Sequence, residues 1–126
     1  MRFALACTLL LAPALVTAQP APRTVEITLS SFKYAPPEVT LEHGRPYVLH
    51  LVNIANGGHD FVAKEFFAAA TLSDADRKRV GEGEIELKGG ASADVSFVAP
   101  APGRYPFHCS HFMHSTFGMK GTLLVR

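Results

Sequence analysis

The sequence predicts an all-β domain, a sandwich of two sheets with about seven or eight short strands and one short helical insertion. Short runs that alternate apolar and polar residues recur from Thr24 to the end of the chain. Glycines and prolines separate these runs, as turn residues do. Residues 64–80 break the rhythm with alanines and charged residues, which favour helix.

The first half of the chain contains three strand signals. Residues 24–29, TVEITL, alternate apolar and polar side chains, as a strand with one buried face does. A second alternating run follows Pro36 and Pro37. The third run, YVLHLVN at residues 47–53, is apolar on both faces, which is typical of a central strand.

The predicted insertion and the second half complete the pattern. Ser73 is placed to cap the N-terminus of a helix with the sequence DADRKRV, and Gly81 follows the last residue of that helix. The strand rhythm then resumes in the segments EIELKGG, ASADVSFVA and GRYPFHC. A final strand, MKGTLLVR, closes the chain.

The N-terminal segment predicts export. Arg2 is followed by the apolar run 3–16 and by small residues up to Ala18, the pattern of a cleavable secretory signal. The run is shorter than the roughly 20 residues of a membrane-spanning helix. Cys7 lies too close to the N-terminus for a lipoprotein attachment site. We therefore expect a periplasmic protein that is not integral to the membrane.

These boundaries divide the chain into a signal peptide at 1–18, a short tail at 19–23 and one domain at 24–126. The mature chain of about 108 residues is long enough for a single core. Without the signal peptide, its eleven basic residues balance eleven acidic ones. This balance argues against nucleic acid or a membrane surface as the partner.

Cleavage leaves Cys109 as the single cysteine of an exported protein. A lone thiol in an oxidising compartment has four explanations: an intermolecular disulfide, a catalytic nucleophile, a buried inert thiol or a metal thiolate. The neighbouring residues favour the last of these explanations.

Four side chains form a candidate ligand set. His114 and Met119 follow Cys109 in the spacing C-x4-H-x4-M, and His59 ends the glycine-rich turn NIANGGHD after the third strand. One thiolate, two imidazoles and a thioether are the ligands of a trigonal copper site with a weak axial methionine. The sequence therefore predicts one copper ion held by these four residues.

The arrangement resembles the cupredoxins, the small blue copper proteins. The segments that carry the resemblance are FKYAPPEVTLEHG, GGHD, GRYPFHC and GMKGTLLV, which together extend over most of the mature chain. The resemblance implies a Greek-key sandwich with one type 1 copper. It further implies a monomeric electron carrier that is not an enzyme.

Two residues of the ligand loop compete with the assigned ligands. His111 is the rival of His114, but its closer spacing to Cys109 would strain the loop. Met113 is the rival of Met119, which precedes the closing strand as the methionine of the family does. We expect redox partners to dock near His114 through three apolar neighbours, Phe112, Met113 and Phe117.

The segment HCSHFMHSTFGM is also similar to the mononuclear copper motif of multicopper oxidases. Ser110 stands where those enzymes have a second histidine, and the chain has no His-x-His pair, which excludes a trinuclear centre within this chain. His108 is expected to be a solvated strand residue on the face opposite Cys109. A further hypothesis is that His108 and His111 assist a second, weaker copper contact or an electron exit path.

Three other residues receive a brief interpretation. His43 is expected in an exposed turn and His50 in a strand. Asp60 stands where the best-known cupredoxins have an asparagine that ties the two ligand loops together. If it is ionised and close, its charge would favour Cu(II) and lower the reduction potential.

Three functions are compatible with these residues. The first is an electron carrier, because four ligands leave no open position for a substrate. The second is copper resistance, storage or delivery, which would use the surplus ligands His108, His111, Met113 and His43. The third, a nitrite-reducing or oxidase enzyme, would need another copper site at a subunit interface.

Overall fold

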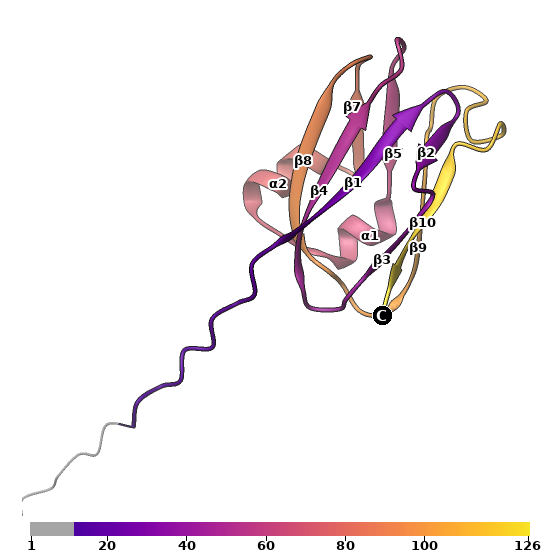
Figure 1. The fold of residues 1–126 in the computed structure, drawn as a ribbon. Coiled ribbons are helices and arrows are strands. Elements are labelled where there is room, and N and C mark those ends of the chain that lie inside the picture. The colour runs from indigo at the N-terminus through magenta and orange to yellow at the C-terminus, as the bar shows by residue number, and fades with distance from the viewer. Residues whose placement is uncertain (1–11) are drawn as a thin grey trace, which may run out of the picture.

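A computed structural model describes residues 12–126 of the chain. Two sheets face each other in a sandwich, and residues 12–22 extend away from it without regular secondary structure (Figure 1). The first eleven residues of the predicted signal peptide lie outside the described part of the chain. Within residues 12–126, no helix has the length and apolar character needed to cross a membrane.

The strands and helices follow the predicted order. In sequence they are β1 (Arg23–Ser30), β2 (Lys33–Ala35), β3 (Glu38–Leu41), β4 (Pro46–Asn53), β5 (His59–Val62), α1 (Lys64–Ala69), β6 (Thr71–Leu72), α2 (Asp74–Val80), β7 (Glu84–Leu87), β8 (Ser92–Val98), β9 (Gly103–His108) and β10 (Lys120–Val125). The described chain has more strands than the seven or eight expected. The prediction missed strands as short as β2 and β6, which have three and two residues. Strands this short carry no detectable alternation in the sequence.

Each sheet has five strands. The first sheet has the order β2-β1-β4-β8-β6, and the second has the order β3-β10-β9-β5-β7. The pairs β1·β4 and β3·β10 are parallel, and the remaining pairs are antiparallel. Because parallel neighbours cannot be joined by a tight hairpin, the chain crosses between the sheets. The predicted all-β sandwich is confirmed.

The core fills the space between the sheets. In β4 the buried side chains alternate with half-buried ones, and its position between β1 and β8 confirms the predicted central strand. Three buried rings, Tyr34, Phe61 and Phe107, pack against one another with centroids 4.7–5.9 Å apart. These rings lie on β2, β5 and β9, so they fix the strands that lead into the ligand loops.

The helical insertion is confirmed, with β6 between its two helices. The Ser73 hydroxyl accepts a hydrogen bond from the backbone N–H of Asp76, which makes Ser73 the N-cap of α2. Gly81 ends the helix with a φ of +48°, a conformation that glycine adopts without steric cost. Arg77 donates from Nη1 and Nη2 to the carbonyls of Phe67 and Ala70, and so joins α2 to the end of α1.

Candidate metal centre

The loops that follow β1, β4 and β9 lie at one end of the sandwich, away from the C-terminus (Figure 1). His59 is the first residue of β5, and Cys109 directly follows β9. His114 lies within the β9–β10 loop, and Met119 ends that loop. The strands therefore place His59 and Cys109 at the ends of two inner strands, β5 and β9, and leave the other two predicted ligands to the β9–β10 loop.

Three of the predicted ligands converge. The Nδ1 atoms of His59 and His114 are 3.1 Å apart. The Sγ atom of Cys109 is 3.9 Å from Nδ1 of His59 and 3.3 Å from Nδ1 of His114. Cys109 is fully buried and His59 is 2% exposed, whereas His114 is half-buried.

This spacing fits a metal ion. Metal–nitrogen bonds of about 2.0–2.1 Å and a metal–sulfur bond of about 2.3 Å, in a trigonal plane, separate the ligand atoms by roughly 3.5–3.8 Å. The three observed distances, 3.1, 3.3 and 3.9 Å, bracket that range. A thiolate with two imidazoles is also a donor set that suits copper or zinc.

Burial acts in opposite ways on the two ligand types, since it favours the neutral imidazole and disfavours the thiolate. Burial lowers the pKa of His59, and the neighbouring His114 and His111 lower it further, which favours the neutral imidazole that binds metal. Burial also raises the pKa of the Cys109 thiol, while hydrogen bonds from the backbone N–H groups of Asp60 and His111 oppose the rise. A metal cation would supply the remaining stabilisation of the thiolate.

His59, Cys109 and His114 form what we call the three-residue group. Met119 is fully buried and lies beside this group. Its carbonyl accepts a hydrogen bond from the N–H of Cys109 at 3.1 Å. Its own N–H donates to the carbonyl of His114 at 3.0 Å. These bonds hold the ends of the loop together, and the role of the thioether as a fourth ligand stays a prediction.

Asp60 ties the two ligand-bearing segments together. One carboxylate oxygen accepts from the backbone N–H of Ser110 at 2.7 Å, and the other accepts from the Ser110 hydroxyl. The hydroxyl of Tyr34 donates to the Asp60 carbonyl at 2.6 Å. Burial raises the pKa of Tyr34 well above its usual value, so this donor stays protonated. The Asp60 carboxylate thus makes the link between ligand segments that an asparagine makes in the best-known cupredoxins.

Asn53 holds the turn that presents His59, a role that the sequence analysis missed. Its side-chain NH2 group donates to three carbonyls, those of Gly57, Leu87 and Lys88, at 2.9–3.2 Å. Its Oδ1 atom accepts from the N–H of Ala55 at 3.0 Å. The available signal was an Asn at the end of a strand before a glycine-rich turn.

The surplus histidines lie outside the three-residue group. His111 directs Nε2 to Glu86, 3.0 Å from both carboxylate oxygens, while its ring centroid is 5.3 Å from that of His114. His108 is an exposed residue of β9 in register with Lys120, as predicted for a solvated strand histidine. His43 lies in an exposed turn and His50 in β4, which confirms both interpretations.

The loop that contains His114 exposes three apolar side chains. Phe112 is 90% exposed, Phe117 is 62% exposed, and Met113 is also exposed. A fourth residue, not predicted from the sequence, is Phe32 in the β1–β2 turn. Its ring contacts His114 edge-on at 4.8 Å and lies 5.3 Å from Phe117. Because Phe32 is distant in sequence, only the fold brings it to this patch, which we call the apolar patch.

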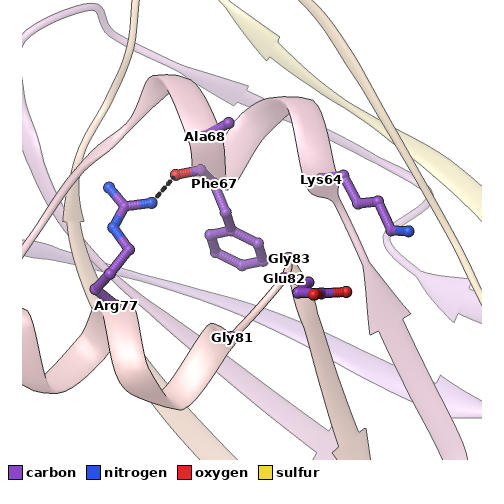
Figure 2. Close-up of a pocket in the computed structure, with 7 residues that line it drawn as sticks. All are labelled: Lys64, Phe67, Ala68, Arg77, Gly81, Glu82 and Gly83. Carbon is purple, nitrogen blue, oxygen red and sulfur yellow. Dashed lines mark hydrogen bonds between the residues drawn. The ribbon is translucent and has the colours of Figure 1, made fainter.

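A separate hollow of about 190 Å³ lies between the helices (Figure 2). Its lining residues are Lys64, Phe67, Ala68, Arg77, Gly81, Glu82 and Gly83. None of them belongs to the metal-ligating group, and Arg77 is already bonded to the carbonyl of Phe67 (Figure 2). The hollow lies where Arg77 joins α2 to the end of α1.

A comparison with protein families decides the affiliation. The family described as "Cupredoxin-like domain" matches residues 2–125. The chain belongs to this cupredoxin-like family. The resemblance carried by the ligand loop and the strand segments is thereby confirmed.

Known relatives of this cupredoxin-like chain include auracyanins. Auracyanin-B of Chloroflexus aurantiacus (strain ATCC 29366 / DSM 635 / J-10-fl) is 37% identical over 84 residues. The match covers 62% of this chain and 36% of that protein, so it spans about a third of the relative's length.

Solved auracyanin structures share the fold. The reduced auracyanin of Roseiflexus castenholzii has a TM-score of 0.63 at 24% identity, over 85% of this chain and 99% of that one. Auracyanin B has a TM-score of 0.62 at 25% identity, over 90% and 95%. Auracyanin A of Chloroflexus aurantiacus, described as a "blue" copper protein, has a TM-score of 0.60 at 18% identity, over 84% and 100%.

Proposed function

We propose that this cupredoxin is an exported type 1 copper protein that carries single electrons between redox partners, and that it is not an enzyme. The residues that would hold the copper are His59, Cys109, His114 and Met119. The observation that carries the proposal is the convergence of one sulfur and two Nδ1 atoms within 3.1–3.9 Å at the patch-bearing end of the sandwich. Auracyanin A, a blue copper protein of the same fold, supports it.

When bound, copper supplies a one-electron cycle between Cu(I) and Cu(II). The chain contributes a site that excludes water, because Cys109 and Met119 are fully buried and His59 nearly so. The strands and the Asp60–Ser110 hydrogen bonds hold the ligand segments in place. A site that moves little between oxidation states needs little reorganisation when an electron is exchanged.

His114 provides the route for the electron to the surface. It is the one half-buried member of the three-residue group, and its ring packs against Phe32 of the apolar patch. We propose that partners dock on this patch, formed by Phe32, Phe112, Met113 and Phe117. We also propose that the carrier is a monomer, because the patch is exposed. We further propose that a signal peptide at residues 1–18 exports it to the periplasm.

The test of the copper site is the visible spectrum of the purified, copper-loaded protein. We expect one copper per chain and the intense absorption of a copper thiolate. A Cys109→Ser variant should lose this absorption, whereas His108→Ala should keep it. A colourless copper-loaded protein, or an unchanged band in Cys109→Ser, would overturn the assignment.

The test of the patch is the rate of electron self-exchange. A Phe112→Ser/Phe117→Ser double variant should exchange electrons about tenfold more slowly, the effect of losing roughly 1.4 kcal/mol of contact energy. Val48→Ser, on the half-buried outer face of β4, is the control. Equal rates in the double variant and the native protein would exclude the patch as the docking surface.

Copper handling is the second candidate function, and the placement of the surplus ligands disfavours it. Delivery of Cu(I) calls for soft sulfur ligands that converge near the surface. His111 is instead paired with Glu86, and His108 belongs to neither metal-ligating group among the described residues. A count of Cu(I) ions separates the functions, because a carrier should hold one and a handling protein more.

A further inference from the structure

A second group of metal-ligating side chains lies next to the proposed copper site. Asp60 on β5, Glu86 on β7 and His111 in the β9–β10 loop each offer a ligand atom within 4.8 Å of the others. We propose that these three residues form a second metal site, for a divalent cation of the Zn²⁺ or Cu²⁺ class. This inference goes beyond the proposed function and does not depend on which metal fills the first site.

The distance between His111 and Glu86 already suits such an ion, and Asp60 lies within 4.8 Å of both. Bonds of about 2.0–2.1 Å place neighbouring ligand atoms roughly 2.9–3.4 Å apart in octahedral or tetrahedral geometry. Nε2 of His111 already lies 3.0 Å from both carboxylate oxygens of Glu86. The Glu86 side chain is half exposed, so its carboxylate is free to turn toward Asp60 and let one ion contact all three residues.

Asp60 has the character of a preorganised ligand. It is 1% exposed, and the N–H and hydroxyl of Ser110 fix its two oxygens. An ionised carboxylate has about four lone-pair positions, so two remain for a cation. Metal-binding carboxylates are commonly held by hydrogen bonds of this kind.

The charges also favour a cation. Two carboxylates share the site with a single imidazole, which at most supplies one positive charge. A divalent ion would neutralise the pair of carboxylates more fully than the histidine alone. The side chains of Glu86 and His111 are open to an approaching ion, because Gly58 has no side chain to cover them. A Cβ atom at this position would lie 3.1 Å from Oε1 of Glu86 and 3.4 Å from Cε1 of His111.

The ligand types define the class of metal. Carboxylates and imidazole suit Zn²⁺ and Cu²⁺, whereas Cu(I) prefers thiolate and thioether ligands. The second site would therefore bind a divalent cation without competing for the soft copper ligands. This property separates it from a Cu(I) delivery site.

Zinc counting tests the proposal. The copper-loaded protein is dialysed to equilibrium against zinc chloride, and both metals are counted per chain. The native protein should hold one more zinc than Glu86→Gln and His111→Gln, while all three keep one copper and the same visible band. Glu84→Gln, an exposed carboxylate two residues away on β7, is the matched control and should keep the extra zinc.

The reduction potential gives an independent readout. A divalent charge beside the copper favours Cu(I), so zinc should raise the potential of the native protein and of Glu84→Gln, but not that of Glu86→Gln. Equal zinc counts in all variants, or displacement of copper by zinc, would overturn the second site. If the copper band itself is absent, the proposed function fails, but the one-zinc difference between native protein and Glu86→Gln still decides this inference.

Discussion

At the scale of single residues, Asp60 combines two roles that an asparagine could share only in part. Its carboxylate accepts two hydrogen bonds from Ser110 and thereby joins the strand of His59 to the loop of His114. Its negative charge also lies beside the proposed copper ligands. The first role depends on hydrogen bonding and the second on charge, so an amide substitution separates them.

We predict that Asp60→Asn raises the reduction potential while the protein stays folded. The amide oxygen can accept from the N–H of Ser110 and the amide NH2 group can donate to its hydroxyl, so the link remains. Loss of the negative charge favours Cu(I). Voltammetry measures the change, with Glu84→Gln as a control that removes an equal charge from an exposed position. A shift no larger than that of the control would refute the prediction.

Asn53 is the residue on which the His59 turn depends most. Asn53→Ala removes three donated hydrogen bonds and one accepted bond at a buried position. We expect the free energy of unfolding to fall by about 1–3 kcal/mol for each buried group left without a partner. Urea denaturation measures the loss, and Asn56→Ala, an exposed asparagine in the same turn, should change little. Equal stability of the two variants would show that Asn53 does not hold the turn.

At the scale of elements, the helical insertion was predictable because its signals are local. The capping serine, the charged first turn and the terminal glycine all lie within residues 73–81. The three residues whose ligand atoms converge were also predicted, by spacing and strand position. Phe32 and Glu86 were not, because they contact the site only when β2 and β7 take their places in different sheets. Contacts of that kind depend on the order of strands, which the alternation of residues does not specify.

We predict that Ser73→Ala weakens α2 without affecting the metal centre. Its hydroxyl accepts from the N–H of Asp76 and donates to the Asp76 carboxylate. Loss of an N-cap lowers the free energy of unfolding by about 0.5–2 kcal/mol. Urea denaturation should show this loss, and the copper absorption should be unchanged. Ser96→Ala, an exposed serine on β8, is the control, and a loss as large in this variant would contradict the capping role.

At the scale of the whole molecule, the end with the ligand loops and the helical insertion have different tasks. The end with the ligand loops carries the three-residue group and the apolar patch (Figure 1). The helices are joined to each other by Arg77 and to the core by Phe66, whose ring contacts Phe97 on β8 and Tyr105 on β9. The functional residues thus lie at strand ends and in the adjoining loops, on a scaffold that the strands and helices make rigid.

The proposed copper site should couple metal binding to the stability of the entire domain. A ligand that binds only the folded state raises the free energy of unfolding by RT ln(1 + [L]/Kd), about 2.7 kcal/mol at one hundred times Kd. We therefore predict that removal of copper lowers the thermal midpoint, and that the difference grows with the logarithm of free copper concentration. Thermal unfolding at several copper concentrations measures it. Cys109→Ser should show a much smaller gain, since a hydroxyl replaces the thiolate, while His108→Ala should behave as the native protein. The same gain in native protein and Cys109→Ser would mean that copper stabilises the fold from another site.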